Sequence, residues 1–544
     1  MLKKIFIFLS FILTFCQCFN INEKQKTNER LKIDIIEGRE IRIVTKSIFK
    51  AKKECDTWSE GTLVFIEKSG HEYRKFKNTQ KVEIPTDDEH IIYAGNNNYL
   101  FIVDDSVYHD VKYFGAKGDG IEDDTYSIAK AVLLNVLLSK GKYNVRLNNI
   151  IAAPDIIIRG EENAIIRAEG EMTFRNGQSN FIIQIYSNTI VKNIIFEGVG
   201  NNHYAIRAPS SKGNTIKNIE ILACKAYKCG LLLVEPIEGF TFNRYNASYE
   251  SWYENGKVKP YHISSNVIVR NCILKGDDKL TPVKNNFRTT ASGIALLYVK
   301  EATIEHNEIL NYRFGIWIYG GASLSEAHDS LSENDILIEK HLVKYNFVSE
   351  TFSAMWASKA RNVNFERNII YDFHDVSLDF EGCQNSKAVN NTVKIKNRGG
   401  IAALNGSQNI IFESNMVEKE SSESAIVYVK NGCSNIQFVN NIFTSKLGLA
   451  KVKIFRGDTF DGPPNKKILF EGNTLKDIQI SIFDKLDESI VLINNKFQSS
   501  TNKLNKKNAV IIPKEGKILL RKNSIQSTDG RIERIIEPRF NYDQ

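Results

Sequence analysis

Hydrophobic and polar residues alternate at period two through much of the second half of this chain, in short stretches that end at asparagine. The segments NIIFESN at 409–415 and NIQFVNN at 435–441 show the alternation clearly. A period of two is typical of strands and not of helices. No helical pattern of ten residues separates these stretches, so a horseshoe of alternating strands and helices is not expected. The pattern predicts a succession of short strands.

The asparagines that end these stretches recur at a nearly constant interval. From Asn346 to Asn441 the successive steps are 22, 23, 24 and 26 residues, and longer steps are interpreted as the same unit with inserted loops. A fixed period in this range indicates a solenoid. Twelve asparagines share the phrase: Asn193, Asn218, Asn271, Asn307, Asn346, Asn368, Asn391, Asn415, Asn441, Asn473, Asn495 and Asn523.

The length of the repeat selects the kind of solenoid. About 23 residues at ~3.3 Å per residue make three short strands with their turns. This is one coil of a right-handed parallel β-helix, whereas propeller repeats span roughly 40–50 residues. We predict an all-β protein of about twelve coils over residues ~150–525. Asparagine suits the recurring turn because it tolerates left-handed backbone, and stacked asparagines can hydrogen-bond between coils.

The start of the chain resembles a secretory signal peptide over residues 1–18. Lys3 and Lys4 precede an apolar run, Ile5–Phe15, that is too short to span a bilayer. Neither Cys16 nor Cys18 follows a small residue, which disfavours a cell-surface lipoprotein, and no later segment suits a membrane span. We therefore expect a secreted or periplasmic protein.

Residues 21–105 lack the asparagine phrase. The segments LKIDII, EIRIV, TLVFIEK, KVEIP and YLFIVDD predict strands of a small β module whose role the sequence does not show. The predicted organisation is a signal peptide at 1–18, this module at 21–105, the β-helix at 108–525 and a C-terminal tail at 526–544.

The segment VKYFGAKGDGIEDDTYSIAKAVLLNVLL at 111–138 joins the module to the coils. Asp119 and Gly120 predict a turn, and Asp123 or Asp124 is expected to cap a helix that runs to Leu138. This segment closely resembles the opening motif of the pectate lyase superfamily of parallel β-helix proteins. The resemblance implies that the helix caps the open apolar end of the coils and that these three aspartates are structural and not catalytic.

Composition and cysteine usage add modest constraints. The chain has 544 residues, 42% of them hydrophobic and 25% charged, and a net charge of +8. This mild basic excess suits an acidic polysaccharide, but it serves solubility equally well. The six cysteines after the signal peptide match no zinc-site spacing. We expect buried thiols, with a Cys224–Cys229 disulfide as an alternative, whereas Cys383 and Cys433 are two coils apart and too distant to pair.

Counting back from the asparagines aligns the strands that would carry the chemistry. A count of 12 residues, with an allowance for an insertion at 322–338, selects Ala295, Trp317, Trp356, Asp379, Ala403 and Val429. Two residues further on, and therefore on the same face of each strand, lie Tyr319, Ser358, Glu381 and Asn405. We expect this column to line a concave face of the β-helix.

Asp379 and Glu381 are the candidate catalytic residues of this face, together with His374 in the preceding turn. The two carboxylates are ~7 Å apart along one strand, whereas Leu378 and Phe380 point inward. One carboxyl can protonate a leaving glycosidic oxygen while the other activates water or attacks, and the ~7 Å spacing favours inversion. Paired acids on a strand also suit a solvated face or a calcium site.

Aromatic and polar neighbours of the pair are candidate substrate-binding residues, because indole rings stack on sugar faces. They are Trp317, Tyr319, Trp356, Lys359, Arg398 and Asn405. The phrase KGDDKL, with Asp277 and Asp278, resembles a polygalacturonase motif. However, 13 residues separate it from the next predicted strand, and no Gly-His-Gly phrase follows. We therefore leave this second pair out of the predicted site.

These features predict a secreted glycoside hydrolase that degrades a polysaccharide without a metal or cofactor. One alternative is a polysaccharide lyase or epimerase acting on a uronate glycan, for which calcium would be expected. Another is a non-catalytic glycan-binding protein or adhesin. The expected partner is a polysaccharide, and neither nucleic-acid binding nor membrane insertion is predicted.

Overall fold

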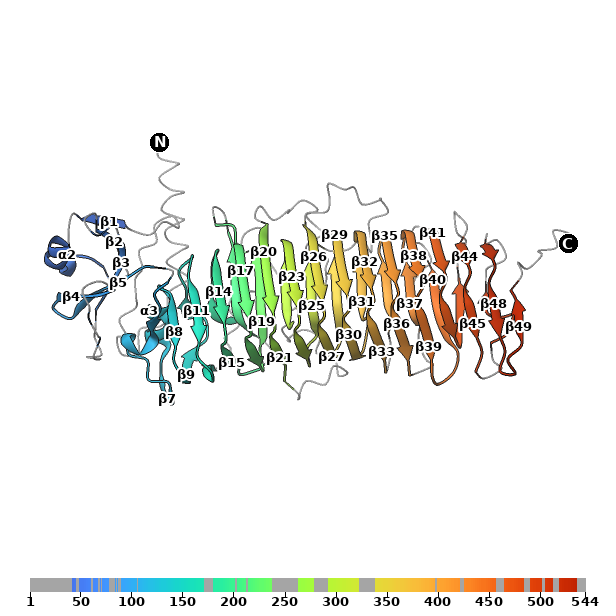
Figure 1. Cartoon of the computed structure of the whole chain (residues 1–544), viewed down its shortest axis with the longest axis horizontal. Coiled ribbons are helices and arrows are strands. Elements are labelled where there is room, and N and C mark those ends of the chain that lie inside the picture. Colours follow the sequence, from blue (N-terminus) through green and yellow to red (C-terminus); the bar gives the residue numbers. More distant parts are fainter. Residues whose placement is uncertain are drawn as a thin grey trace, which may run out of the picture.

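The chain forms an elongated solenoid with a small sheet at its N-terminal end (Figure 1). The computed structural model describes residues 42–535, except for short stretches within 46–105 and twelve further segments. These segments are 171–179, 201–202, 212–213, 237–262, 278–291, 322–337, 397–398, 421–424, 456–463, 484–489, 501–503 and 512–517. The predicted signal peptide, residues 1–18, lies outside the described residues, as does the expected strand LKIDII.

Three long sheets run along the solenoid, with 13, 15 and 16 strands. Each coil contributes one strand to each sheet; for example, β29 (Ala360–Glu366), β30 (Ile369–Phe373) and β31 (Leu378–Glu381) follow one another along the chain. Strands of successive coils pair in parallel, which confirms the predicted parallel β-helix of about twelve coils. Inward-facing side chains of all three sheets fill one continuous apolar core.

The 13-stranded sheet carries most of the residues predicted to be functional, and its strands follow each other in chain order. They are β10 (Ile150–Ile151), β13 (Asn180–Gln184), β16 (His203–Ser210), β19 (Gly230–Pro236), β22 (Ile294–Leu297), β25 (Phe314–Tyr319), β28 (Ser353–Ser358), β31, β34 (Ile401–Leu404), β37 (Ala425–Lys430), β40 (Ala450–Phe455), β43 (Ile478–Ile482) and β46 (Val510–Ile511).

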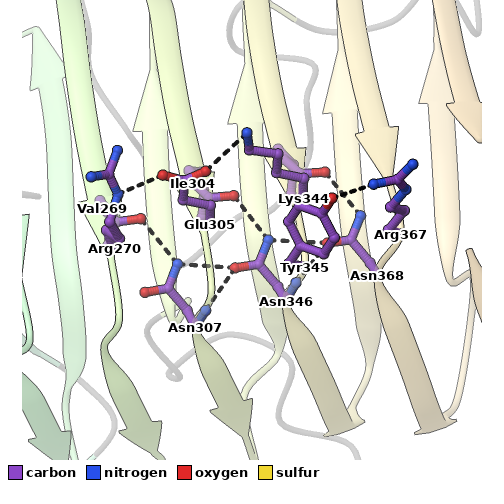
Figure 2. A network of polar contacts seen from close by, with 11 residues as sticks. Val269, Arg270, Ile304, Glu305, Asn307, Lys344, Tyr345, Asn346, Arg367 and Asn368 are labelled. Carbon is purple, nitrogen blue, oxygen red and sulfur yellow. Dashed lines mark hydrogen bonds and ion pairs between the residues drawn. The ribbon is translucent and has the colours of Figure 1, made fainter.

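A buried asparagine ladder closes the turn between the 15- and 16-stranded sheets. Asn346 Nδ2 donates to Asn368 Oδ1 at 3.0 Å in the next coil and to the Ile304 carbonyl at 2.9 Å in the previous coil. The Asn346 backbone N–H also donates to Asn368 Oδ1, and Figure 2 shows this arrangement beside surface ion pairs. The same pattern confirms the predicted single row of Asn346, Asn368, Asn391, Asn415 and Asn441, and it extends from Asn307 to Asn523.

Three of the twelve asparagines lie outside this ladder, which corrects the prediction. Asn193 and Asn271 have φ of 57° and lie one residue before the ladder position, which Cys272 occupies after Asn271. Asn218 belongs to a second, exposed row with Asn188 and Asn266. Left-handed backbone therefore occurs at the residue before the ladder asparagine, such as Tyr345 before Asn346. The ladder asparagines are selected for their amide bonds and not for tolerance of positive φ.

The helix at the N-terminal end of the coils is shorter than predicted. Helix α3 spans Thr125–Ala131, and Val136–Leu138 forms strand β8 of the 15-stranded sheet. The apolar run at 132–138 continues into the core as a strand because pairing with β11 (Ile157–Gly160) buries it. Asp124 accepts hydrogen bonds from the backbone of Lys117 and Gly118, which supports the structural role that the resemblance implies.

The N-terminal module is a five-stranded sheet in the order β1-β2-β3-β5-β4. Its strands are β1 (Arg42–Thr45), β2 (Leu63–Ile66), β3 (His71–Lys77), β4 (Ile91–Gly95) and β5 (Asn98–Ile102), with helix α2 (Ile48–Glu54). EIRIV, TLVFIEK and YLFIVDD were predicted as strands and overlap β1, β2 and β5, whereas β3, β4 and α2 were not predicted. Phe76 and Phe101 pack on Phe114, so the module covers the N-terminal end of the solenoid core.

The cysteines and the remaining chain end complete the fold. All six described cysteines are buried free thiols, so the alternative Cys224–Cys229 disulfide was wrong.

Strand β49 (Ile532–Arg534) pairs antiparallel with β48 (Ser524–Gln526) at the C-terminal end, within the predicted tail. Within the described part of the chain, no helix has the length and apolarity needed to cross a bilayer.

Candidate functional site on the 13-stranded sheet

The predicted column of outward-facing side chains exists over the central strands of the 13-stranded sheet. Ala295 pairs with Trp317, Trp317 with Trp356, and Trp356 with Asp379. In the neighbouring outward column, Tyr319 pairs with Ser358, which in turn pairs with Glu381. Three adjacent coils therefore present the two tryptophans and the two carboxylates on one face.

The orientation of β31 also agrees with the prediction. Phe380 is fully buried and stacks on Phe365, with ring centroids 5.0 Å apart, and Leu378 is fully buried as well. Because side chains alternate across a strand, Asp379 and Glu381 lie on the outer side. The register of this strand is thus fixed by its core contacts.

The predicted register fails by one residue beyond β31. Asp379 pairs with Ala402 and not Ala403, Ala402 pairs with Tyr428 and not Val429, and Glu381 pairs with Leu404 and not Asn405. Asn405 lies in the following turn, with φ of 54°, and accepts a hydrogen bond from Asn431 Nδ2.

The cause is a longer turn after β34 and β37. Only Gly382 has a positive φ between β31 and the next strand. Two consecutive residues, Asn405 and Gly406 after β34 and Asn431 and Gly432 after β37, have positive φ in the later coils. Each Asn-Gly pair adds one residue to the turn, so a count of 12 overshoots by one position.

Four aromatic side chains form a buried cluster on this face, comprising Phe314, Trp317, Tyr319 and Trp356. The two indoles stack with centroids 5.6 Å apart and an interplanar angle of 8°. Phe314 packs on both, and Tyr319 packs 5.4 Å from Trp317. Trp317 and Trp356 are only 8% and 6% exposed, so each indole face meets a neighbouring ring and not open solvent. The expected pair of open stacking platforms is replaced by a packed aromatic wall.

Asp379 lies beside this wall in dry surroundings. Its side chain is 5% exposed, and its Oδ1 accepts no hydrogen bond in the described structure. Burial raises the pKa of Asp379 well above its usual range, and the negative charges of Glu381 and Asp375 raise it further. Asp379 is therefore protonated under conditions in which ordinary aspartates are ionised.

Asp375 is a third carboxylate near the pair, in the turn between β30 and β31. Its Oδ2 accepts a hydrogen bond from Ser353 Oγ at 3.2 Å. Surrounding protein atoms raise the pKa of Asp375, although its outer side remains in contact with solvent. The site thus contains a buried acid, the half-buried Glu381 and a carboxylate at the solvent boundary.

Asp379→Asn should stabilise the fold at neutral pH. The folded state binds this proton more tightly than the unfolded state does, because the pKa of the acid is raised on folding. That contribution to stability is therefore lost as pH rises from the unfolded pKa, about 3.9, toward the folded value. Asparagine has the same shape and no ionisation. We expect the variant to have a higher urea midpoint than the wild type at pH 7 and the same midpoint near pH 4. Equal midpoints at both pH values would contradict the raised pKa.

The other predicted residues are less tightly grouped. His374 is half-buried in the turn before β31, where its backbone N–H bonds the Thr351 and Phe352 carbonyls. Lys359 follows Ser358 with φ of 46°, and its backbone N–H donates to the Glu381 carbonyl. Arg398 lies outside the described residues, as does Asp278, whereas Asp277 follows β21 (Ile273–Lys275) and does not lie on the 13-stranded sheet.

No metal-binding group is present among the residues that the structure describes: His, Cys, Asp and Glu nowhere gather in threes with suitable geometry.

Because the count was wrong by one residue beyond β31, the sequence prediction missed several outward-facing residues of the later coils. Tyr428, Lys430 and Lys453 lie in the same two columns as Asp379 and Glu381. Sequence reasoning missed them because it placed Val429 in the column. The dipeptides Asn405-Gly406 and Asn431-Gly432 were the signal that could have corrected the count, since Asn-Gly marks turns that need positive φ.

Comparison with known proteins supports the fold. The chain is similar to the pre-mature gene product 12 of bacteriophage phi29, with 14% identity, a TM-score of 0.55 and coverage of 77% of this chain and 57% of that one. It is also similar to the A-module of an Azotobacter vinelandii mannuronan C-5 epimerase, at 11% identity, a TM-score of 0.40 and coverage of 77% and 99% respectively. A Yersinia enterocolitica family 28 exopolygalacturonase matches at 11% identity and a TM-score of 0.40, with 79% of each chain covered.

The likeness to gene product 12 shows a shared architecture alone. A search of curated protein sequences gave no match. The model of the family described as the right handed beta helix region matches residues 136–336 and 274–449, which together are more than half of the chain. The asparagine ladder, the three parallel sheets and this match agree, and the chain belongs to the right-handed β-helix family.

Proposed function

We propose that this protein is a polysaccharide-degrading glycoside hydrolase whose site is the outer face of β28, β31 and the neighbouring strands. The observation that carries the proposal is the Asp379–Glu381 pair, in which one carboxyl is buried and the other is half-buried on the same strand face. Environments that push two neighbouring carboxyls apart in pKa are the usual basis of an acid and base pair.

Each carboxyl has a distinct role in the proposed reaction. The raised pKa of Asp379 keeps its proton available for the leaving glycosidic oxygen. Glu381, nearer to solvent, activates a water molecule or attacks the anomeric carbon. The ~7 Å between the two Cα atoms favours the first option and inversion, which an NMR assay of the newly formed anomer would test.

The aromatic wall excludes water from one side of the pair. Burial of Trp317 and Trp356 lowers the local dielectric and strengthens the interaction between the two carboxyls. The predicted signal peptide implies that the enzyme would encounter its substrate outside the cytoplasm.

Trp356→Ala should affect both stability and catalysis. Removing a nearly buried indole that packs on Phe314 and Trp317 should cost about 3–5 kcal/mol in the free energy of unfolding. It should also admit water beside Asp379, which would lower its pKa and shift the alkaline limb of the activity profile to lower pH. Trp356→Phe, which retains a ring, should show smaller changes in both measurements, so an unshifted profile in Trp356→Ala would contradict the wall's role.

A glycan panel tests the proposed function directly. Wild-type protein should release new reducing ends from at least one polysaccharide, and the Asp379→Asn, Glu381→Gln double variant should not. Products that carry an unsaturated uronate, detected by ultraviolet absorbance, would show a lyase. Binding without any cleavage across the panel would favour the non-catalytic glycan-binding alternative.

A further inference from the structure

We propose that Lys430, Lys451 and Lys453 form an anion-binding subsite that selects a negatively charged polysaccharide. This inference rests on the proposed function, because it names the substrate class of the same site. The three lysines lie on β37 and β40, on the outer face of the 13-stranded sheet. They follow the carboxylate pair along the solenoid, on the side opposite the aromatic cluster.

The lysines are in register with the carboxylates. Glu381 pairs with Leu404, which pairs with Lys430, so two coil steps separate Glu381 from Lys430. From Asp379 the column passes through Ala402 and Tyr428 to Lys453, which is three coil steps. At ~4.8 Å per step these separations are about 10 Å and about 14 Å. One coil step is close to the length of one sugar unit in an extended chain, so a glycan along this face would bring units two and three from the cleaved bond to the lysines.

The side chains of these strands point to solvent on this face. In β40, Lys451 is exposed and Lys453 half-buried, and they alternate with the fully buried Val452 and Ile454. Lys430 is half-buried, and its Nζ lies 5.6 Å from the centre of the Phe455 ring. Tyr428 and Phe455 are also half-buried on this face, so apolar ring surface accompanies the positive charge. Rings beside cations suit a ligand that combines sugar faces with anionic groups.

The adjacent strands of this sheet supply no carboxylate to Lys451 and Lys453. Strands β34, β37, β40 and β43 contain no Asp or Glu at any position. Within the described part of the chain, neither Lys451 nor Lys453 takes part in an ion pair.

Lysines on the 15-stranded sheet are arranged differently. Lys340 pairs with Glu301, Lys344 with Glu305, and Lys387 with Glu366, in each case across adjacent coils. Figure 2 shows the Lys344–Glu305 pair among these cross-coil contacts. Pairing of this kind reduces the repulsion that arises when like charges stack in a solenoid. No such pair forms at Lys451 or Lys453 among the described residues, so β40 presents a positive surface near the proposed catalytic carboxyls, which favours an anionic ligand.

A polysaccharide fits this surface better than a nucleic acid does. The subsite continues a face whose carboxyl pair suits acid–base chemistry at a glycosidic bond. Carboxylated or sulfated sugars two or three units from the cleaved bond would lie beside the lysines.

The test is equilibrium binding of wild-type protein to polygalacturonate, to dextran sulfate and to carboxyl-reduced polygalacturonate, which is neutral. We expect binding to at least one anionic glycan that weakens with added salt, and weaker binding to the neutral chain. The triple variant K430Q, K451Q, K453Q should bind the anionic glycan about tenfold more weakly at low salt, because it loses three charge contacts at the protein surface. Its affinity for the neutral chain should be unchanged.

A matched triple variant on the 16-stranded sheet, K225Q, K476Q, K496Q, makes the same change in net charge away from the site. It should bind as the wild type does, and equal weakening in both triples would overturn the subsite. Failure of the wild type to bind either anionic glycan would also overturn it, as would tighter binding of single-stranded DNA than of the glycans. Binding is measured without turnover, so the two proposals can fail separately. Lysine-dependent binding without cleavage would refute the hydrolase and support the subsite. Cleavage of neutral glycans alone would support the hydrolase and refute the subsite.

Discussion

Replacing Asp379 by asparagine is expected to lower turnover roughly 10²–10⁴-fold. The proposed acid loses its proton while its shape and its contacts in the sheet remain, since β31 is held by the buried Leu378 and Phe380. Substrate affinity should change little, because the lost interaction acts in the transition state. The measurement is kcat and KM on the glycan that the panel identifies.

Glu381→Gln is expected to have an effect of similar size, through loss of the base or nucleophile. Asp372→Asn is the matched control: Asp372 lies in the preceding strand β30, has a φ of 40° that asparagine tolerates, and pairs with Lys396 on the surface. It should retain nearly full turnover. Full activity in the Asp379→Asn, Glu381→Gln double variant would remove the pair from the mechanism and direct attention to His374 and Lys359.

The two predicted effects of Asp379→Asn, on stability and on turnover, have opposite signs. A buried carboxyl beside a second carboxyl weakens the fold at neutral pH, and nothing in the core requires it there. A residue that is costly to the fold and has no structural partner for its Oδ1 is the pattern expected at a functional site. An asparagine variant that is both more stable and inactive would support this interpretation more strongly than either result alone.

The architecture could be predicted because a solenoid repeats its local rules in every coil. The spacing from Asn346 to Asn441 located the coils, and the alternation around Phe380 located the inner and outer faces of β31. The register of Trp317, Trp356 and Asp379 followed from the same count. These features are local, so the sequence contains them without knowledge of the fold.

The remaining features depend on contacts that no single coil contains. The burial of Trp317 and Trp356 arises because in-register indoles of adjacent coils stack on each other. The depth of Asp379 likewise depends on neighbouring coils. The position of Tyr428 was missed for a different reason: the turn at Asn431-Gly432 contains one extra residue, so the count of 12 back from Asn441 overshoots by one position. The β module escaped full prediction because β3 and β4 do not repeat.

Asn391→Ala is expected to destabilise the solenoid by about 3–5 kcal/mol, more than most single substitutions. Asn391 Oδ1 accepts from both the backbone N–H and Nδ2 of Asn368, and its own Nδ2 donates to Asn415 Oδ1 and the Phe365 carbonyl. Alanine leaves several of these buried groups without partners, and each such group costs about 1–3 kcal/mol. The loss should be concentrated in the coils that contain Asn368 and Asn415, because solenoid coils interact mainly with their neighbours.

Urea unfolding combined with hydrogen exchange measures both the size and the place of this loss. Asn409→Gly is the control, because Asn409 belongs to the exposed asparagine row, hydrogen-bonds Asn385 and has a φ of 55° that glycine accepts. We expect its urea midpoint to stay close to that of the wild type. Exchange protection in Asn391→Ala should fall first around residues 365–415 and least near the N-terminal module. Equal effects of the two substitutions would mean that the buried row contributes no more than the exposed one, and that core packing alone holds the coils in register.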